Sequence, residues 1–325
     1  MSGTAMRDVW GTKLVELGDA DPRTVVLDGD LGNSTKADKF AKAHPDRFFQ
    51  MGIAEQNLVG AAAGLAATGF VPWTSSFTVF FTHRALDPIR MLVAQSHANV
   101  KIVGSYSGLL IGAVGKTHLD VQDLAIMRAM PDMTVLAPAD EAELRSMMDW
   151  AQAFDGPVYF RLVRDAVPDL FGADYVFVPG AIQVVNDGGP DPAVVFVSTG
   201  GQTARVVEAA NQLAESGIAA TVIHAPSLKP FDAEGLVAAV GGTPLVVTVE
   251  EHTVAGGLGG LVAETLASAG AGAGARVVRF GLDDVWGESA SNEFLLEKHG
   301  LSADRVAERT AALLDREPAT QGTSR

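Results

Sequence analysis

The sequence predicts an α/β protein built from two doubly wound domains, and three observations support this. The chain has 325 residues, which suits two domains better than one. Short runs rich in valine and isoleucine alternate with helical patterns along the chain, as in βαβ units. These runs are apolar on both faces, which is typical of parallel strands buried between layers of helices.

The expected elements follow in order along the chain. The first domain should hold strands at 24–28, 71–74, 100–104, 134–137 and 157–162, and the second should hold strands at 193–198, 220–224, 245–249 and 276–280. A helix with an apolar stripe is expected at 54–68, and another at 203–216, where Gly217 can close the helix. Glycine and proline gather at 171–192 around one short strand-like piece, 181–185. We therefore expect a first domain at 1–172, a linker at 173–192, a second domain at 193–316 and a frayed tail at 317–325.

Composition excludes some functions. With 24 basic and 39 acidic residues the net charge is −15, which disfavours a surface for nucleic acid or for anionic membranes. The chain contains no cysteine, so disulfides, thiol catalysis and cysteine-ligated zinc are excluded. No targeting segment or membrane span is evident, and a cytoplasmic protein is expected.

Two segments of the first domain offer groups for binding a flat ring. Glu55 stands in the first turn of the helix expected at 54–68. It could simply favour the helix dipole, or it could be a desolvated carboxylate that shares a proton with a heteroaromatic nitrogen. Phe77, Phe80 and Phe81 follow at helical spacing and are either a core stripe or a stacking platform.

Three further segments follow strands, where α/β proteins place their sites. The loop at 104–120 is rich in glycine and carries His118, for which a functional and a structural role are about equally supported. Arg161 and Arg164 lie at a strand end and could hold an anion or form surface ion pairs. The glycine-rich segment 256–260 is only a weak candidate for a phosphate cradle, because no basic residue accompanies it.

The order of these segments resembles the C-terminal half of transketolase, in which a pyrimidine-binding domain precedes the transketolase C-terminal domain. The resemblance covers about residues 7–314. The segments that carry it are DGDLGNST (28–35), MGIAEQNLVGAAAG (51–64), SSFTVFF (75–81), GKTH (115–118), LAIMRAMPDMTVLAPAD (124–140), SLKPFD (227–232) and VEEHTVAGGLG (249–259).

The resemblance implies a thiamine-diphosphate-dependent transferase that moves a two-carbon ketol unit from a ketose to an aldose. Such enzymes also need a pyrophosphate-binding domain with a Gly-Asp-Gly sequence, which holds the diphosphate and Mg²⁺. Here Asp28-Gly29-Asp30 lacks the first glycine, and the sequence shows no metal-ligand cluster. We therefore expect the second subunit of a split enzyme, which works with a separate pyrophosphate-domain chain in an α₂β₂ assembly.

The resemblance also assigns roles to individual residues. Glu55 matches the glutamate that bonds N1′ of the aminopyrimidine, and Phe80 matches the ring that stacks on it, with Phe77 in the same pocket. Asp30 matches a carboxylate near the cofactor, and His83 takes a place that is usually aromatic. The residues that match sugar-phosphate and donor contacts are Arg7, Ser34, Arg164 and His118.

Two departures bear on specificity. Val114 stands where the family usually has an aspartate that binds a substrate hydroxyl, and Tyr106 replaces a histidine at the phosphate end. Since a hydrogen-bonding site discriminates strongly, the usual ketose-phosphate specificity is in doubt. Three alternatives remain open: a 1-deoxyxylulose-5-phosphate synthase-like enzyme, although that is normally one long chain; the beta subunit of a 2-oxo-acid dehydrogenase, which the GKTH sequence disfavours; and an inactive partner homologue.

Overall fold

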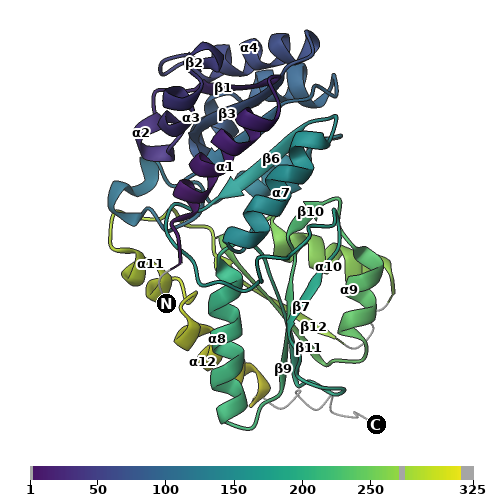
Figure 1. Cartoon of the computed structure of the whole chain (residues 1–325). Helices are drawn as coiled ribbons and strands as arrows, with labels where there is room; N and C mark the ends of the chain where they lie inside the picture. The colour runs from purple at the N-terminus through teal and green to yellow at the C-terminus, as the bar shows by residue number, and fades with distance from the viewer. Residues whose placement is uncertain (1–2, 271–274, 316–325) are drawn as a thin grey trace, which may run out of the picture.

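The computed structural model describes residues 3–270 and 275–315, and these residues form two β-sheets, each covered by helices on both faces (Figure 1). The fold class predicted from the sequence is confirmed. The strands of the first sheet are β1 (Thr24–Asp28), β2 (Phe48–Gln50), β3 (Val71–Phe77), β4 (Lys101–Ser105), β5 (Thr134–Leu136), β6 (Val158–Leu162) and β10 (Ser227–Lys229). Their order is β10-β5-β6-β4-β3-β1-β2, and only β10 runs antiparallel to its neighbour.

Helices cover both faces of the first sheet. The α-helices are α1 (Met6–Ala20), α2 (Gly32–Thr35), α3 (Asp38–Ala43), α4 (Glu55–Ala67), α5 (Leu86–Pro88), α6 (Asp123–Arg128) and α7 (Glu141–Ala153). The shorter turns are 3₁₀-helical η1 (Pro45–Arg47) and η4 (Gly112–Thr117), and π-helical η2 (Phe80–Arg84) and η3 (Ile89–Ala94). Trp10 of α1 and Met147 of α7 pack on one face of the sheet. Leu58 of α4 and Ile89 of η3 pack on the other.

The second sheet is built in the same way. Its strands are β7 (Gln183–Asn186), β8 (Val194–Ser198), β9 (Ala220–His224), β11 (Leu245–Thr253) and β12 (Arg276–Leu282), in the order β12-β11-β8-β9-β7. Its helices are α8 (Gln202–Glu215), α9 (Ala233–Val240), α10 (Leu258–Ser268), α11 (Asn292–Lys298) and α12 (Ala303–Leu314). Side chains of α8 and α12 pack in one cluster, whereas α9 and α10 contribute to the cluster that also contains α4.

Strand β10 joins the two halves of the molecule. It follows β9 of the second sheet but pairs antiparallel with β5 of the first, with Ser227 opposite Leu136. Lys229 strengthens the junction, because its Nζ donates to the carbonyl oxygen of Met130. The two sheets are therefore linked by backbone pairing as well as by a shared apolar cluster.

The predicted elements agree well with the observed ones, with a few differences. The strands expected at 24–28 and 220–224 have these bounds, and the helices expected at 54–68 and 203–216 correspond to α4 and α8. The strand expected at 71–74 continues to Phe77, because Ser75 and Ser76 lie buried in it with hydrogen-bonded side chains. Strand β7 lies inside the stretch interpreted as a linker and pairs with β9.

Lys101 is a buried cation that we expect to make stability depend on pH. Its Nζ donates to the carbonyl oxygens of Phe154 (2.7 Å) and Gly156 (2.8 Å). Burial lowers the pKa of Lys101 to about 7, against the opposing effect of Asp155. Because the folded pKa lies below the ordinary value of 10.5, the unfolded chain binds more protons between these two values. The free energy of unfolding should therefore rise with pH in this window, by roughly 1 kcal/mol per pH unit.

Urea titrations of the native chain and of Lys101→Met at several pH values above neutrality measure this contribution. The native chain should gain stability with rising pH relative to the variant, in which the titrating group is absent. Equal pH dependence of the two proteins would contradict the assignment.

Candidate active site

A cavity of about 520 Å³ lies beyond the carboxyl ends of β3 and β4. This is the edge where parallel α/β sheets bind ligands. The sequence-predicted residues that line it are Ser34, Phe77, Tyr106, Val114, His118 and Arg164. The second half of the molecule closes the cavity with Ala290, Ser291 and Asn292. Asn292 accepts a hydrogen bond from the backbone N–H of Gly112 (3.0 Å), so α11 is fixed against the loop that carries His118.

One end of the cavity is polar and cationic. The Arg7 guanidinium donates to the Tyr106 hydroxyl (2.9 Å) and to the carbonyl oxygen of Ser34 (3.4 Å). The Tyr106 hydroxyl also donates to the Ser34 carbonyl (3.1 Å). The Arg164 guanidinium lies 5.5 Å from the centroid of the Tyr106 ring and pairs with Asp165 (2.9 Å). The structure thus brings Arg7, Ser34, Tyr106 and Arg164 together. Arg164 lines the cavity and can face an anion there, whereas Arg7 lies behind the lining and contacts Ser34 and Tyr106.

Aromatic rings line the other side. Phe77 stacks on Tyr106 at a centroid distance of 4.2 Å and on Phe80 at 6.0 Å. His118 meets the Phe80 ring edge-on at 5.5 Å. Of the two alternatives for these rings, a single helical core stripe does not describe the structure: Phe77 ends strand β3, Phe80 begins the π-helix η2, and Phe81 is buried in the core on the other side. Phe77 therefore lines the cavity, Phe80 is half-buried beside it, and Phe81 belongs to the core.

Glu55 is the first residue of α4 and its side chain is completely buried. One carboxylate oxygen accepts from the Ser76 hydroxyl (2.8 Å), and the other forms an ion pair with Arg84. A side chain at position 29 would crowd this carboxylate, because a Cβ added to Gly29 would lie 3.3 Å from its oxygen. Glu55 is thus a desolvated carboxylate fixed by two donors, which exceeds what a helix-dipole role requires.

Two carboxylates at the end of β1, Asp28 and Asp30, have different surroundings, and Asp30 does not have the position expected from the sequence. Asp30 is exposed, has a positive φ of 67° and is not part of the lining. The buried neighbour Asp28 accepts from the backbone N–H groups of Leu31 and Gly32, both at 3.0 Å. Burial raises the pKa of Asp28, although the hydrogen bond from Gln50 lowers it in part. Asp28 therefore shapes the turn that presents Ser34, a role that the sequence did not indicate.

His83 lies beside the main cavity. It is half-exposed, its Nε2 lies 4.0 Å from the buried carboxylate of Asp120, and both line a separate cavity of about 280 Å³. Burial and the nearby charge of Asp123 raise the pKa of Asp120. His83 therefore lines a different cavity from the one that contains Phe77 and His118.

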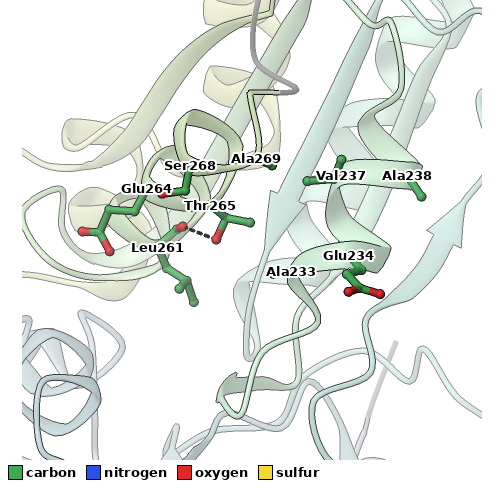
Figure 2. A pocket seen from close by; sticks show the side chains of 9 residues that line it. All are labelled: Ala233, Glu234, Val237, Ala238, Leu261, Glu264, Thr265, Ser268 and Ala269. Carbon is green, nitrogen blue, oxygen red and sulfur yellow. Dashed lines mark hydrogen bonds between the residues drawn. The ribbon is translucent and has the colours of Figure 1, made fainter.

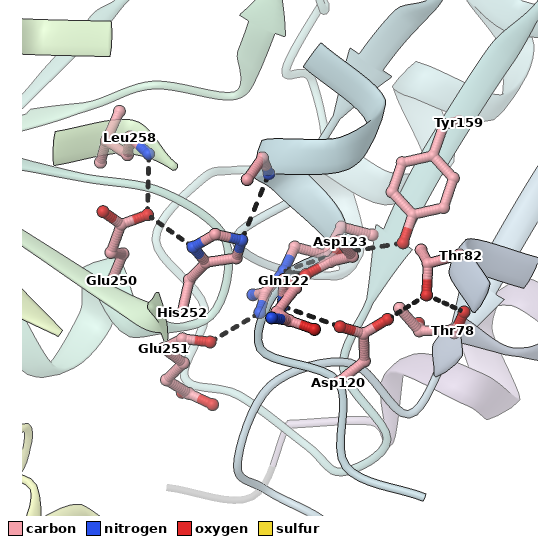
Figure 3. A network of polar contacts seen from close by, with 12 residues as sticks. Thr78, Thr82, Asp120, Gln122, Asp123, Tyr159, Glu250, Glu251, His252 and Leu258 are labelled. Atoms are coloured by element: carbon pink, nitrogen blue, oxygen red, sulfur yellow. Dashed lines mark hydrogen bonds and ion pairs between the residues drawn. The ribbon is translucent and has the colours of Figure 1, made fainter. Parts of the chain in front are cut away.

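A buried polar network supports the loop that carries His118 (Figure 3). Arg161 pairs with Asp123 (3.0 Å) and donates to the carbonyl oxygen of Glu251 (2.7 Å). The Glu251 carboxylate in turn accepts from the N–H of Leu109 (3.3 Å). Arg161 is therefore a structural cation between the two halves of the molecule, neither an anion ligand nor part of a surface ion pair.

The glycine-rich segment 256–260 does not cradle a phosphate. The N–H groups of Leu258 and Gly259, at the start of α10, donate to the Glu250 carboxylate at 2.7 and 2.8 Å. A carboxylate of the chain itself already occupies the helix terminus (Figure 3).

A larger cavity, about 660 Å³, lies between α9 and α10 (Figure 2). Small and aliphatic side chains such as Ala233, Val237 and Leu261 form most of its wall. None of the residues singled out in the sequence lines it. The smaller cavity that contains His118 is therefore the candidate active site.

Within residues 3–270 and 275–315, no cluster of three or more His, Asp or Glu side chains is arranged to hold a metal ion. None of the helices in these same ranges is long and apolar enough to span a membrane.

The family models of the transketolase pyrimidine-binding domain and the transketolase C-terminal domain match residues 2–169 and 180–306. The chain therefore belongs to the transketolase family, as the sequence predicted. It is 37% identical to the 6-deoxy-6-sulfo-D-fructose transketolase subunit of Clostridium sp., over 96% of this chain and 95% of that protein. It is 36% identical to an apulose-4-phosphate transketolase subunit of Actinobacillus succinogenes, over 87% of this chain and 90% of that protein.

A solved structure described as a split gene transketolase, inactive beta4 tetramer, superposes with a TM-score of 0.85. It shares 45% sequence identity and covers 97% of this chain and 100% of its own. The 1-deoxy-D-xylulose-5-phosphate synthase of Thermomicrobium roseum is 38% identical over 95% of this chain, but this chain spans only 48% of that protein. Among these proteins, the subunits named transketolase match this chain over most of their own length.

Proposed function

We propose that the chain is the second, pyrimidine-binding subunit of a split transketolase that moves a two-carbon ketol unit from an anionic ketose to an aldose. The observation that carries this proposal is the position of Glu55. Its buried carboxylate lies at the start of α4 and pairs with Arg84, which also lies over the ring of Phe80. Phe80 in turn contacts His118, which lines the cavity. The similarity to named transketolase subunits supports the same activity.

The residues present fit the aminopyrimidine of thiamine diphosphate. Glu55 can hold a proton at N1′, and Phe77 and Phe80 provide the face on which the ring stacks. When bound, thiamine diphosphate supplies an acidic C2–H and an electron sink for the carbon–carbon cleavage. His118 lies edge-on to Phe80, where its imidazole can hold or move a proton at an oxygen of the donor.

The cationic end of the cavity favours a donor with a negative terminal group. Arg7 and Arg164 provide guanidinium N–H donors that suit either phosphate or sulfonate oxygens, with Tyr106 and Ser34 between them. Relatives are named for a sulfonated sugar and for a phosphorylated sugar. We propose that the donor of this enzyme is one of these two classes.

A separate pyrophosphate-domain subunit would supply Mg²⁺ and the diphosphate contacts, in an α₂β₂ assembly. An apolar surface next to Glu55 is suited to such a contact. Ile53, Met91 and Leu92 are 72%, 44% and 45% exposed. On α4 itself, the open space over Gly64 permits close approach of another backbone.

We expect the chain alone to be inactive and to bind thiamine diphosphate weakly, because the matched families are the pyrimidine-binding and C-terminal domains and a pyrophosphate-binding domain would supply the diphosphate and Mg²⁺ contacts. Activity should appear when a partner carrying the Gly-Asp-Gly sequence is added together with magnesium. The test is co-purification of the two chains, followed by a donor screen with thiamine diphosphate. Tight cofactor binding by the isolated chain in calorimetry would contradict this prediction, and an inactive but stable complex would favour a non-catalytic partner homologue.

A further inference from the structure

Arg84 lies between the two groups that the aminopyrimidine would use. It is the last residue of the π-helix η2, and its guanidinium forms an ion pair with the buried carboxylate of Glu55. The same guanidinium lies over the ring of Phe80, with its central carbon 4.4 Å from the ring centroid. One planar cation therefore occupies both the carboxylate and the aromatic face.

These contacts are of the kind that a heteroaromatic base would make. A guanidinium is flat, donates N–H groups to carboxylate oxygens and stacks on aromatic rings. An aminopyrimidine is also flat, and would use the same Glu55 oxygen and the same face of Phe80. The other Glu55 oxygen is bonded to Ser76 at 2.8 Å. Arg84 and the pyrimidine therefore compete for one position.

Arg84 can leave without disturbing the core. Its side chain is 40% exposed, whereas that of Glu55 is completely buried. Rotation of a half-exposed arginine costs little, but a buried carboxylate that loses its cation must gain another partner. The ion pair therefore stabilises the unliganded chain and yields when a ring arrives whose N1′ shares a proton with Glu55.

We infer that Arg84 closes the aminopyrimidine position of the unliganded chain and must swing away for the cofactor to bind. This inference rests on the proposed function. The apparent affinity of a ligand equals its intrinsic affinity multiplied by the fraction of molecules in which the site is open. If the position is open in about one molecule in ten, removing the arginine should tighten ring binding by about tenfold.

The variant Arg84→Met tests this, with Arg90→Met as the matched control. Arg90 belongs to the next π-helix and is exposed. Within the described residues, its side chain donates a hydrogen bond only to the sulfur of Met91. Thiamine, which carries the ring without the diphosphate, serves as the probe for the full-length chain in ligand-observed NMR. We expect about tenfold tighter binding in Arg84→Met and no change in Arg90→Met.

Thermal unfolding provides the second measurement. Arg84→Met should lower the melting temperature of the native chain, because Glu55 loses its cation, but should have little effect in a Glu55→Gln background. Thiamine binding that is weaker, unchanged or absent in Arg84→Met would overturn the inference, as would equal destabilisation in both backgrounds. Failure of the proposed function would appear elsewhere, as absent turnover in the complex with a partner subunit.

Discussion

Glu55→Gln is expected to lower turnover of the assembled enzyme by about 10²–10⁴-fold, the usual size of a general acid–base contribution. The amide can still accept a hydrogen bond from Ser76, which lies 2.8 Å from the carboxylate oxygen in the native chain. It cannot, however, hold a proton at N1′ of the aminopyrimidine. The fold should survive, because glutamine has nearly the same shape as glutamate, and the Arg84 side chain that loses its partner is 40% exposed and can turn to solvent.

Exchange of the C2 proton of the bound cofactor, followed by NMR, is the direct measurement. The matched control is Glu141→Gln, because Glu141 is likewise the first residue of an α-helix, α7, but does not line the candidate site. The control should exchange at the native rate. If Glu55→Gln also exchanges at the native rate in a folded complex, Glu55 has no part in proton transfer.

Much of the fold could be predicted because buried parallel strands have a simple pattern. Runs such as β1 and β9 are apolar on both faces, and their bounds agree with the prediction. Strand β10 could not be predicted in this way, since it has three residues and exists only because β5 offers an edge. The end of β3 escapes prediction for a similar reason: Ser75 and Ser76 look like loop residues until their hydroxyls find buried partners.

The candidate site shows the same division. The sequence indicated Glu55, Phe77, Phe80 and His118 through their segments. In the structure the two phenylalanines contact His118, and Glu55 is linked to Phe80 through Arg84. The sequence did not indicate Arg84. This residue ends a π-helix, and the 3.6-residue spacing of apolar residues that reveals α-helices does not reveal a π-helix. Partners such as Asp28 and Asp123 are found only when tertiary contacts are known.

Val114→Asp should change the choice of donor. Val114 lines the cavity and is 51% exposed, so an aspartate can replace it without burying a charge. The resemblance to the transketolase family implies an aspartate at this position, where it would bind a hydroxyl of the sugar. A site made to hydrogen-bond a hydroxyl can discriminate by as much as about 10⁴-fold. The residues around position 114 are not arranged to orient a newly introduced carboxylate. We therefore expect kcat/KM for xylulose 5-phosphate, relative to the native donor, to rise by about 10–100-fold, only part of that range.

The measurement is kcat/KM for xylulose 5-phosphate relative to the native donor, in the enzyme assembled with its partner. Val114→Asn is the matched control, because it has the shape of aspartate but offers a neutral amide, and it should recover less of the gain. Arg7 and Arg164 are unchanged in both variants, so affinity for the anionic end of the donor should stay the same. Any difference in kcat/KM between the variants should then come from the contact between residue 114 and the sugar hydroxyl. If the native enzyme already uses xylulose 5-phosphate as well as any donor, and Val114→Asp changes nothing, then position 114 does not determine specificity.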